Sequence, residues 1–418
     1  MRILFLCHRF PFPPKGGAKI RAFYMIQHLS RRNEVTVASL VRSAQEASDG
    51  EGLRDHCSNY LMERVRSPAA LLRMVARLIT RQPSSFGYFW SPRLAQRVRE
   101  AIATNKYDLI VVHCSSMAPY VNEVKNVPKV LDFCDMDSQK WLAYGGFKSF
   151  PLSLGFYQEG LKLQMAEADL ARKFEVCTCN TQAELRTLLG YNTNTQADWF
   201  PNGVDTERFQ PGSESYDPDT VSFVGRMDYY PNEECMVDFC QNTLPLIRAR
   251  RPNVELIIVG ADPSRRVRRL GRLGGVTVTG SVPEVQPYVQ RSAVTIAPLN
   301  IARGTQNKIL ESLAMGVPVV CSTLAAGGVD ATPGEHLLTA SSPREYANAI
   351  LRILEDPAQR SRLARAGRAR VLSHHTWEHS MTKMDAIIDR CLASFKRRYE
   401  GSEPAQEIPS AKGGRLRT

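Results

Sequence analysis

The stretch 304–311, GTQNKILE, combines residue types that could bind a phosphorylated ligand. It begins with a polar loop whose consecutive backbone N–H groups lie just before a helix expected over 307–315. Those amides, the positive end of the helix dipole and the ammonium of Lys308 could together hold a diphosphate. The carboxylate of Glu311, one turn further along, would repel phosphate but could accept hydrogen bonds from the two hydroxyls of a ribose. The spacing therefore favours a nucleotide. The loop consists of Gly304, Thr305, Gln306 and Asn307.

A pair of glycines, Gly16 and Gly17, lies between a strand expected at 2–8 and a helix expected at 18–32. Glycines at such a turn let backbone N–H groups approach an anion at the helix N-terminus. The spacing is not that of the GxGxxG dinucleotide motif. The turn could therefore contact phosphate or be structural.

The elements that would position these residues form two series of buried strands separated by amphipathic helices. This alternation predicts an α/β fold with two doubly wound parallel sheets, whose ligands bind at the carboxyl ends of the strands. We expect domains at 1–200 and 201–375, a helix at 376–398 and a disordered tail at 399–418, with a Pro/Gly/Asp-rich linker near 195–220. The strands are expected at 2–8, 34–41, 108–115, 127–135 and 174–180, then at 221–227, 254–260, 276–282, 293–299 and 317–323.

Two apolar segments of the first half leave alternatives open. The segment 67–82 reads as a helix with arginines every four residues, which could lie on an anionic membrane or be an ordinary surface helix. The segment 145–164 combines phenylalanines, leucines and turn residues. It could be a mobile hydrophobic loop for a lipid-like acceptor, or part of the core.

The 418 residues carry a formal net charge of +12, which favours an anionic partner such as nucleotide phosphates or lipid head groups, or a basic solvated surface. No recognition motif supports a nucleic-acid partner. The ten cysteines lack zinc-site spacing, and no signal peptide or transmembrane segment is expected. We therefore expect a cytoplasmic protein with reduced thiols and no metal site, with peripheral contact at the inner face of the plasma membrane left open.

Four sequence segments resemble a known family. NKILESLAMGVPVV, FVGRM, PNGVDTERF and the segment 276–299 are similar to the C-terminal motifs of GT-B glycosyltransferases of family 4. Within that family, the segments PFPPKGG, VLDFCDMDSQKW and MDYYPN resemble bacterial sugar transferases of exopolysaccharide gene clusters. The resemblance covers the chain to about residue 398.

This resemblance implies the GT-B fold, with the donor bound by the C-terminal domain, the acceptor by the N-terminal domain, and a C-terminal helix crossing back. It implies transfer of a sugar from a UDP- or GDP-type nucleotide sugar to a polyprenyl-diphosphate-linked or other glycan acceptor. The reaction would retain the anomeric configuration and need neither metal nor cofactor. A UDP-sugar 2-epimerase and a catalytically inactive nucleotide-binding protein are the alternatives.

The resemblance also assigns roles to single residues. Arg226 and Lys308 would meet the diphosphate, and His113, at the end of a strand, would lie near the reacting sugar. Arg226 could instead be a structural ion-pair partner and His113 a buried core histidine. Asp135 and Asp137 could bind the acceptor or position His113, or they could belong to a turn that caps the next helix.

Two positions depart from the family pattern. Arg303 stands where a glutamate usually contacts the donor sugar. Pro231 or a neighbour stands where a lysine usually follows the arginine at position 226. Sugar specificity is therefore the property most open to change in this chain.

Overall fold

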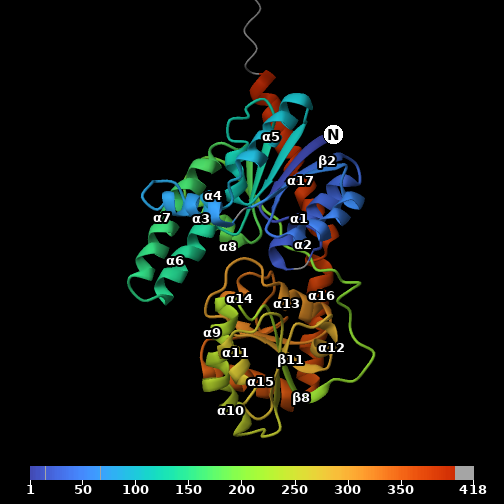
Figure 1. Ribbon diagram of the computed structural model, residues 1–418. Coiled ribbons are helices and arrows are strands. Elements are labelled where there is room, and N and C mark those ends of the chain that lie inside the picture. The colour runs from blue at the N-terminus through green and yellow to red at the C-terminus, as the bar shows by residue number, and fades with distance from the viewer. Residues whose placement is uncertain (15, 66, 401–418) are drawn as a thin grey trace, which may run out of the picture.

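The computed structural model describes residues 1–14, 16–65 and 67–400 and contains two parallel β-sheets (Figure 1). The strand order is β3-β2-β1-β4-β5-β6-β7 in the first sheet and β10-β9-β8-β11-β12-β13 in the second. Every strand pairing described is parallel, which confirms the expected doubly wound α/β fold. The strands are β1 Arg2–Cys7, β2 Glu34–Val41, β3 Asn59–Arg64, β4 Leu109–His113, β5 Lys129–Cys134, β6 Val176–Cys179, β7 Gln196–Trp199, β8 Asp217–Val224, β9 Glu255–Val259, β10 Val276–Gly280, β11 Ser292–Ala297, β12 Val319–Ser322 and β13 Leu338–Ala340.

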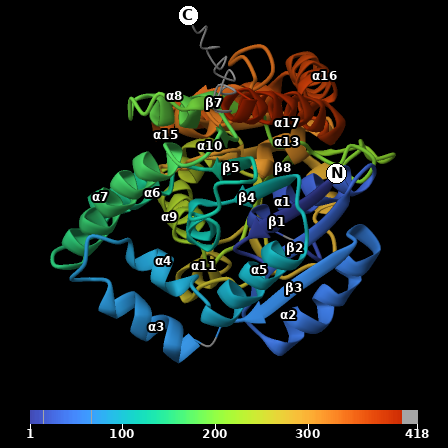
Figure 2. The ribbon, with the colours of Figure 1, turned by 90° about the horizontal axis from the view of Figure 1, so that it is seen from above.

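Helices flank both sheets, and the first sheet lies above the second in Figure 1; Figure 2 shows the arrangement from above. The helices are α1 Gly17–Ser30, α2 Ala44–Asp49, α3 Ser67–Ala76, α4 Ser84–Tyr88, α5 Pro92–Thr104, α6 Asp137–Phe147, α7 Leu152–Ala171, α8 Gln182–Leu189, α9 Tyr230–Asp238, α10 Leu244–Arg248, α11 Arg265–Leu270, α12 Gln286–Gln290, α13 Asn307–Ala314, α14 Thr323–Ala326, α15 Pro343–Glu355, α16 Pro357–His374 and α17 Trp377–Glu400. Three short segments adopt other helical forms: η1 Gly50–His56, η2 Ser115–Tyr120 and η3 Phe239–Thr243.

Helix α17 crosses back from the second sheet to the first, as expected for the GT-B fold (Figure 1). Its residues Met381, Met384 and Ile387 are buried in the same cluster as Ile3 and Val111 of the first sheet. The helix begins one residue later and ends two residues later than predicted. Of the tail predicted at 399–418, residues 401–418 lie outside the described part of the chain.

Three strands were missed because their sequences lack a long apolar run. β3 (NYLMER) and β7 (QADW) are edge strands of mixed composition, and β13 has only three residues. β7 lies within the segment that was read as a linker near 195–220. A strand at a sheet edge needs less apolar surface than a central strand such as β4 (LIVVH), which is buried throughout.

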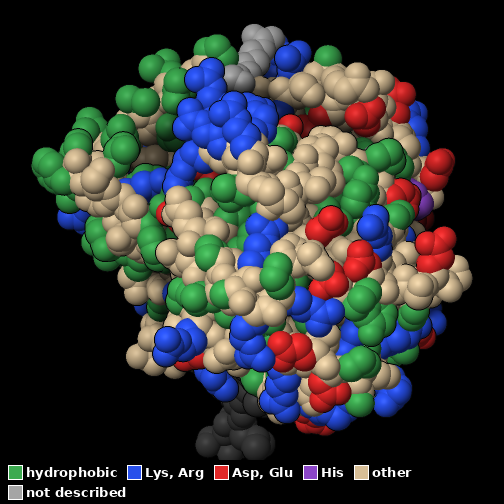
Figure 3. Space-filling model, turned by 90° about the horizontal axis from the view of Figure 1, so that it is seen from below, with side chains coloured by type: hydrophobic (Ala, Val, Ile, Leu, Met, Phe, Trp, Pro, Cys, Tyr) green, Lys and Arg blue, Asp and Glu red, His purple; other side chains and the backbone are tan. Residues whose placement is uncertain are grey.

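The segment 145–164 belongs to a helical hairpin formed by α6 and α7, whose turn is exposed while Leu163 of α7 is buried in the core of the first sheet. The hairpin projects from the N-terminal half at the left of Figure 1, and Figure 3 shows hydrophobic side chains gathered along that edge. Phe150, at the turn, is 81% exposed. Helix α3, expected over 67–82, ends at Ala76. Among the described residues, no helix has the length and apolar character needed to cross a membrane.

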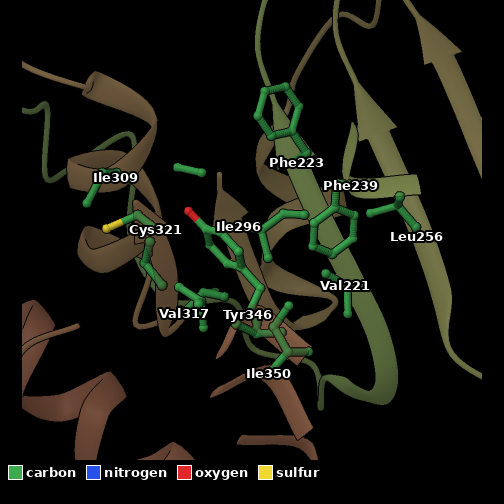
Figure 4. Close-up of a cluster of buried hydrophobic side chains, with 14 of the residues drawn as sticks. Val221, Phe223, Phe239, Leu256, Ile296, Ile309, Val317, Cys321, Tyr346 and Ile350 are labelled. Atoms are coloured by element: carbon green, nitrogen blue, oxygen red, sulfur yellow. The ribbon is translucent and has the colours of Figure 1, made fainter. Parts of the chain in front are cut away.

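The core of the second sheet anchors the candidate site (Figure 4). Apolar side chains from the strands pack against helices α13 and α15 on either side, and none of the labelled residues is more than 8% exposed. The labelled residues are Val221, Phe223, Phe239, Leu256, Ile296, Ile309, Val317, Cys321, Tyr346 and Ile350. Ile309 belongs to α13, so the helix that carries Lys308 and Glu311 is fixed to the sheet by its buried face.

Candidate functional site

The loop 304–306 lies where the two halves of the chain approach each other, directly before α13. Gly304 has a φ of +60°, and a side chain there would collide with the carboxylate of Asp135, which follows β5 of the first sheet. Only glycine fits this conformation and this close approach. The Oγ1 atom of Thr305 is buried without a hydrogen-bond partner among the described residues. The expected loop therefore sits at the carboxyl ends of strands from both sheets.

The ammonium of Lys308 points from α13 to the first turn of α9, the helix that follows β8. Its Nζ donates to Oδ1 of Asn232 over 2.8 Å and lies 4.1 Å from the ring centre of Phe223. Asn232 in turn donates to the backbone oxygen of Arg226 over 2.9 Å. Burial lowers the pKa of Lys308 to about 8. The family pattern has a lysine near position 231, where this chain has Pro231. Lys308 instead places an ammonium group beside Asn232, the next residue.

The carboxylate of Glu311 lines a cavity of about 130 Å³, together with Arg208, Asn307 and Trp377. It makes no hydrogen bond or ion pair with the described residues. Burial raises its pKa to about 7, against the opposing effects of Arg208 and Lys308. An acceptor without a partner in a small cavity suits a ligand that brings hydroxyl donors.

Arg226 is exposed and already paired. Its Nη2 lies 2.6 Å from Oδ2 of Asp228 and 3.4 Å from Oδ2 of Asp262. The structure therefore shows the ion-pair arrangement that was the alternative for this residue. A diphosphate contact would require the guanidinium to exchange these carboxylates for phosphate oxygens.

His113 ends β4 and is held by a buried carboxylate that sequence reasoning missed. Its Nδ1 lies 2.8 Å from Oδ2 of Asp132, which also accepts hydrogen bonds from Arg21 over 2.9 and 3.0 Å and from Thr178 over 2.9 Å. Burial opposes ionisation of Asp132, but Arg21 and His113 outweigh it and hold the pKa of Asp132 below its ordinary value. Asp132 therefore favours a proton on Nδ1, which leaves Nε2 of His113 free to meet a ligand.

Arg21 connects this N-terminal cluster to α13. Its Nη1 donates to Oδ1 of Asn202 over 3.0 Å, and Nδ2 of Asn202 donates to Oδ1 of Asn307 over 3.4 Å. The sequence did carry one signal for the cluster: Asp132 lies inside a buried strand, where a charge needs an opposite charge. The contact with Arg21 spans 111 residues, and no local pattern predicts it.

The remaining predicted residues lie around the same region. Gly17 begins α1, and a Cβ added there would lie 3.7 Å from Nδ2 of Asn307. Gly16 precedes the helix with a φ of +90°. Asp135 accepts from Nδ2 of Asn180 over 2.7 Å, and Asp137 begins α6, with its pKa raised by burial.

Gln306 is the residue before α13, and its side chain donates to the backbone oxygen of Arg303 over 3.1 Å. Nη1 of Arg303 also lies 3.9 Å from Oε1 of Glu184, a residue of α8 in the N-terminal half of the chain. Burial raises the pKa of Glu184 to about 7. The departure at position 303 thus introduces an arginine next to a carboxylate from the other half of the chain.

Comparison with known proteins agrees with this arrangement. Residues 15–208 match the model of Glycosyltransferase Family 4, and residues 218–356 match that of Glycosyl transferases group 1. The chain has the fold of a sucrose-phosphate synthase from Thermosynechococcus elongatus, at 19% identity, a TM-score of 0.71 and coverage of 94% of this chain and 100% of that one. It also has the fold of Anabaena HepE in complex with UDP, at 16% identity, a TM-score of 0.68 and coverage of 93% and 100%.

The fold and the two matched models define a GT-B glycosyltransferase. The chain belongs to glycosyltransferase family 4 through its N-terminal part and carries a group 1 domain in its C-terminal part. A relative in sequence is a GDP-mannose-dependent monoacylated alpha-(1-6)-phosphatidylinositol monomannoside mannosyltransferase of Corynebacterium glutamicum, 26% identical over 231 residues. That match spans 50% of this chain and 60% of the relative.

Proposed function

We propose that the protein transfers a sugar from a UDP- or GDP-type nucleotide sugar to a hydroxyl group of a glycan or lipid-linked acceptor. The observation that carries this proposal is the arrangement on α13: the loop amides and Lys308 at its start, and the unpartnered Glu311 one turn later. The diphosphate would lie at the former and the ribose at the latter. One relative uses GDP-mannose and one solved neighbour holds UDP, so both bases stay open.

In the proposed reaction, the protein must stabilise the negative charge that develops on the departing nucleoside diphosphate. Lys308 and the loop amides would supply this stabilisation from positions at the start of α13, and Arg226 would add to it once it exchanges its two carboxylate partners for phosphate oxygens. His113, oriented by Asp132, would face the reacting sugar from the acceptor side. We propose retention of the anomeric configuration, with a donor phosphate oxygen taking the proton of the acceptor hydroxyl.

The donor site predicts a dependence of affinity on pH. If ribose hydroxyls donate to ionised Glu311, binding favours the deprotonated form of a group whose pKa is about 7 in the free protein. Affinity should therefore fall by up to about tenfold per pH unit below that value, and fall again above about pH 8, where Lys308 of the free protein loses its proton. Calorimetric titration with a UDP- or GDP-sugar measures this, because its diphosphate has no proton to exchange in that range. Glu311→Gln should bind more weakly and without the fall on the acid side; an unchanged acid limb in the variant would contradict the assignment.

The acceptor side supports a lipid-linked substrate. Exposed apolar side chains gather on α3 and the α6–α7 hairpin, and the two are joined because Nζ of Lys162 donates to the backbone oxygen of Leu78 over 2.8 Å. Ile79 is 95% exposed. Exposed apolar clusters of this kind mark interaction sites, and Arg73 of α3, with Arg77 and Arg81 just after the helix, suits an anionic surface. We propose that this face rests on the inner membrane and that the acceptor is a polyprenyl-diphosphate-linked glycan of exopolysaccharide synthesis.

Vesicle sedimentation tests the membrane face. Phe150→Ser/Leu154→Ser should reduce binding to vesicles containing phosphatidylglycerol by roughly tenfold or more, since each apolar side chain buried in lipid contributes about 1.5–3 kcal/mol. The matched control is Leu189→Ser/Leu246→Ser, which removes two exposed leucines from other helices. Equal binding by both variants would contradict this orientation.

A further inference from the structure

A groove of about 820 Å³ lies beside α3, and four arginines line it: Arg42, Arg64, Arg73 and Arg93. Within the part of the chain that the structure describes, none of the four forms an ion pair. The carboxylate that also lines the groove, Glu63, is paired with Arg97 over 2.8 Å. The groove therefore has a strong positive charge that no protein carboxylate balances, and it is suited to an anion.

The local structure adds to this charge. Helix α5 begins at the groove with Ser91, Pro92 and Arg93, and its first turn contains no acidic residue. The positive end of its dipole therefore acts in the same direction as the arginines. The guanidinium of Arg73 is held in place, since its Nε donates to the backbone oxygen of Gly87 over 3.2 Å.

The groove opens at the ligand-binding edge of the first sheet. Val41, the last residue of β2, pairs in register with Arg64, the last residue of β3, and Arg42 follows directly. In the strand order, β2 lies two positions from β4, which ends at His113. Strands are about 4.8 Å apart and His113 lies level with Ser39, three residues before Arg42, so the two backbones are separated by roughly 14 Å. Arg42 is also one of the charges that lower the pKa of the intervening His8, after burial and His113.

One side of the groove is apolar. Val65, Pro68 and Ala69 line it, and Leu72, which follows Ala69 by three residues on the same face of α3, is 71% exposed. Leu71 and Val75 are exposed beside it. An anion that fits the arginines would therefore meet bare hydrophobic surface next to them.

We propose that the arginine groove binds the phosphate or diphosphate of an amphiphile whose hydrocarbon chain lies along α3. This inference rests on the proposed function, because it assigns the acceptor to the first sheet: the head phosphate would sit in the groove while the acceptor hydroxyl reaches His113. The head group of a membrane phospholipid carries a phosphate of the same kind. The phosphate could therefore come from the acceptor or from a membrane lipid, and only the membrane lipid requires a bilayer.

Farnesyl diphosphate is the probe, in titrations of the full chain without nucleotide. Arg64→Gln/Arg93→Gln should weaken its binding by at least about tenfold, because each arginine contributes charge-assisted hydrogen bonds to phosphate. The control Arg99→Gln/Arg172→Gln removes the same charge from exposed positions elsewhere. Farnesol, which lacks the diphosphate, should bind all three proteins equally.

Sedimentation with phosphatidylglycerol vesicles separates the sources. If the groove variant keeps vesicle binding, the groove binds the acceptor phosphate; if it loses both, membrane head groups use the groove as well. Either result supports the phosphate site. Farnesyl diphosphate binding that is absent from the wild type, or equal in the groove and control variants, would overturn it. Because no nucleotide is used, that failure would leave the donor site untouched.

Discussion

Replacing Lys308 by methionine is expected to lower the turnover of sugar transfer by about a hundredfold to a thousandfold. Removing one preorganised group that stabilises transition-state charge typically has an effect of this size. Methionine keeps the stem that packs against Phe223 but removes both the charge and the hydrogen bond to Oδ1 of Asn232. Because Asn232 is buried, loss of that donor should lower the free energy of unfolding by about 1–3 kcal/mol.

Steady-state kinetics with a saturating acceptor measure this effect, and thermal unfolding shows whether the fold is intact. The expected pattern is a loss in kcat that exceeds any rise in KM for the nucleotide sugar, because the leaving diphosphate carries more charge than the bound donor. A rise in KM alone would show that Lys308 holds the donor without stabilising the leaving group. Unchanged kinetics would show that Lys308 takes no part in donor binding or catalysis.

Asp132→Asn is expected to impair both folding and catalysis. Arg21 would lose its buried counter-ion, and breaking a buried pair in this way costs about 3–5 kcal/mol. His113 would lose the carboxylate that favours a proton on Nδ1, so turnover of the folded fraction should fall by on the order of a hundredfold or more. Urea unfolding and the pH profile of kcat measure the two effects separately.

Thr178→Val is the matched control, since Thr178 donates to the same carboxylate but carries no charge. It should cost only about 0.5–1.5 kcal/mol of stability and leave the pH profile of kcat in place. If Asp132→Asn lowers stability but leaves the pH profile and kcat unchanged, Asp132 has a structural role only, and His113 is not positioned for catalysis by it.

The sequence predicted what depends on local pattern. The central strands are continuous apolar runs, and the loop before α13 combines glycine, amides and charge within eight residues, so both could be recognised without a structure. The edge strands β3 and β7 could not, because their half-polar sequences resemble loops. The α6–α7 hairpin was misread because its apolar side chains are exposed, and apolar composition alone does not distinguish a bare surface from a core.

The site was predictable only in part, because its polar contacts join distant segments. Neither the pairing of Arg21 with Asp132 nor that of Lys308 with Asn232 leaves a signal in sequence spacing. The same holds for the arginine groove, whose members come from the ends of β2 and β3, the last turn of α3 and the start of α5. These charged residues are far apart in the sequence, and they come together only in the tertiary structure.

The most direct test is to incubate the protein with UDP- and GDP-sugars labelled in the sugar and a polyprenyl-diphosphate-linked saccharide in detergent, and to follow the label. A transferase moves the label from one nucleotide to the acceptor, releases the nucleoside diphosphate and retains the anomeric configuration. Label that stays on the nucleotide in an altered sugar would indicate a 2-epimerase. Donor that binds but is neither transferred nor hydrolysed would indicate an inactive binder. Either of these two results would contradict the account.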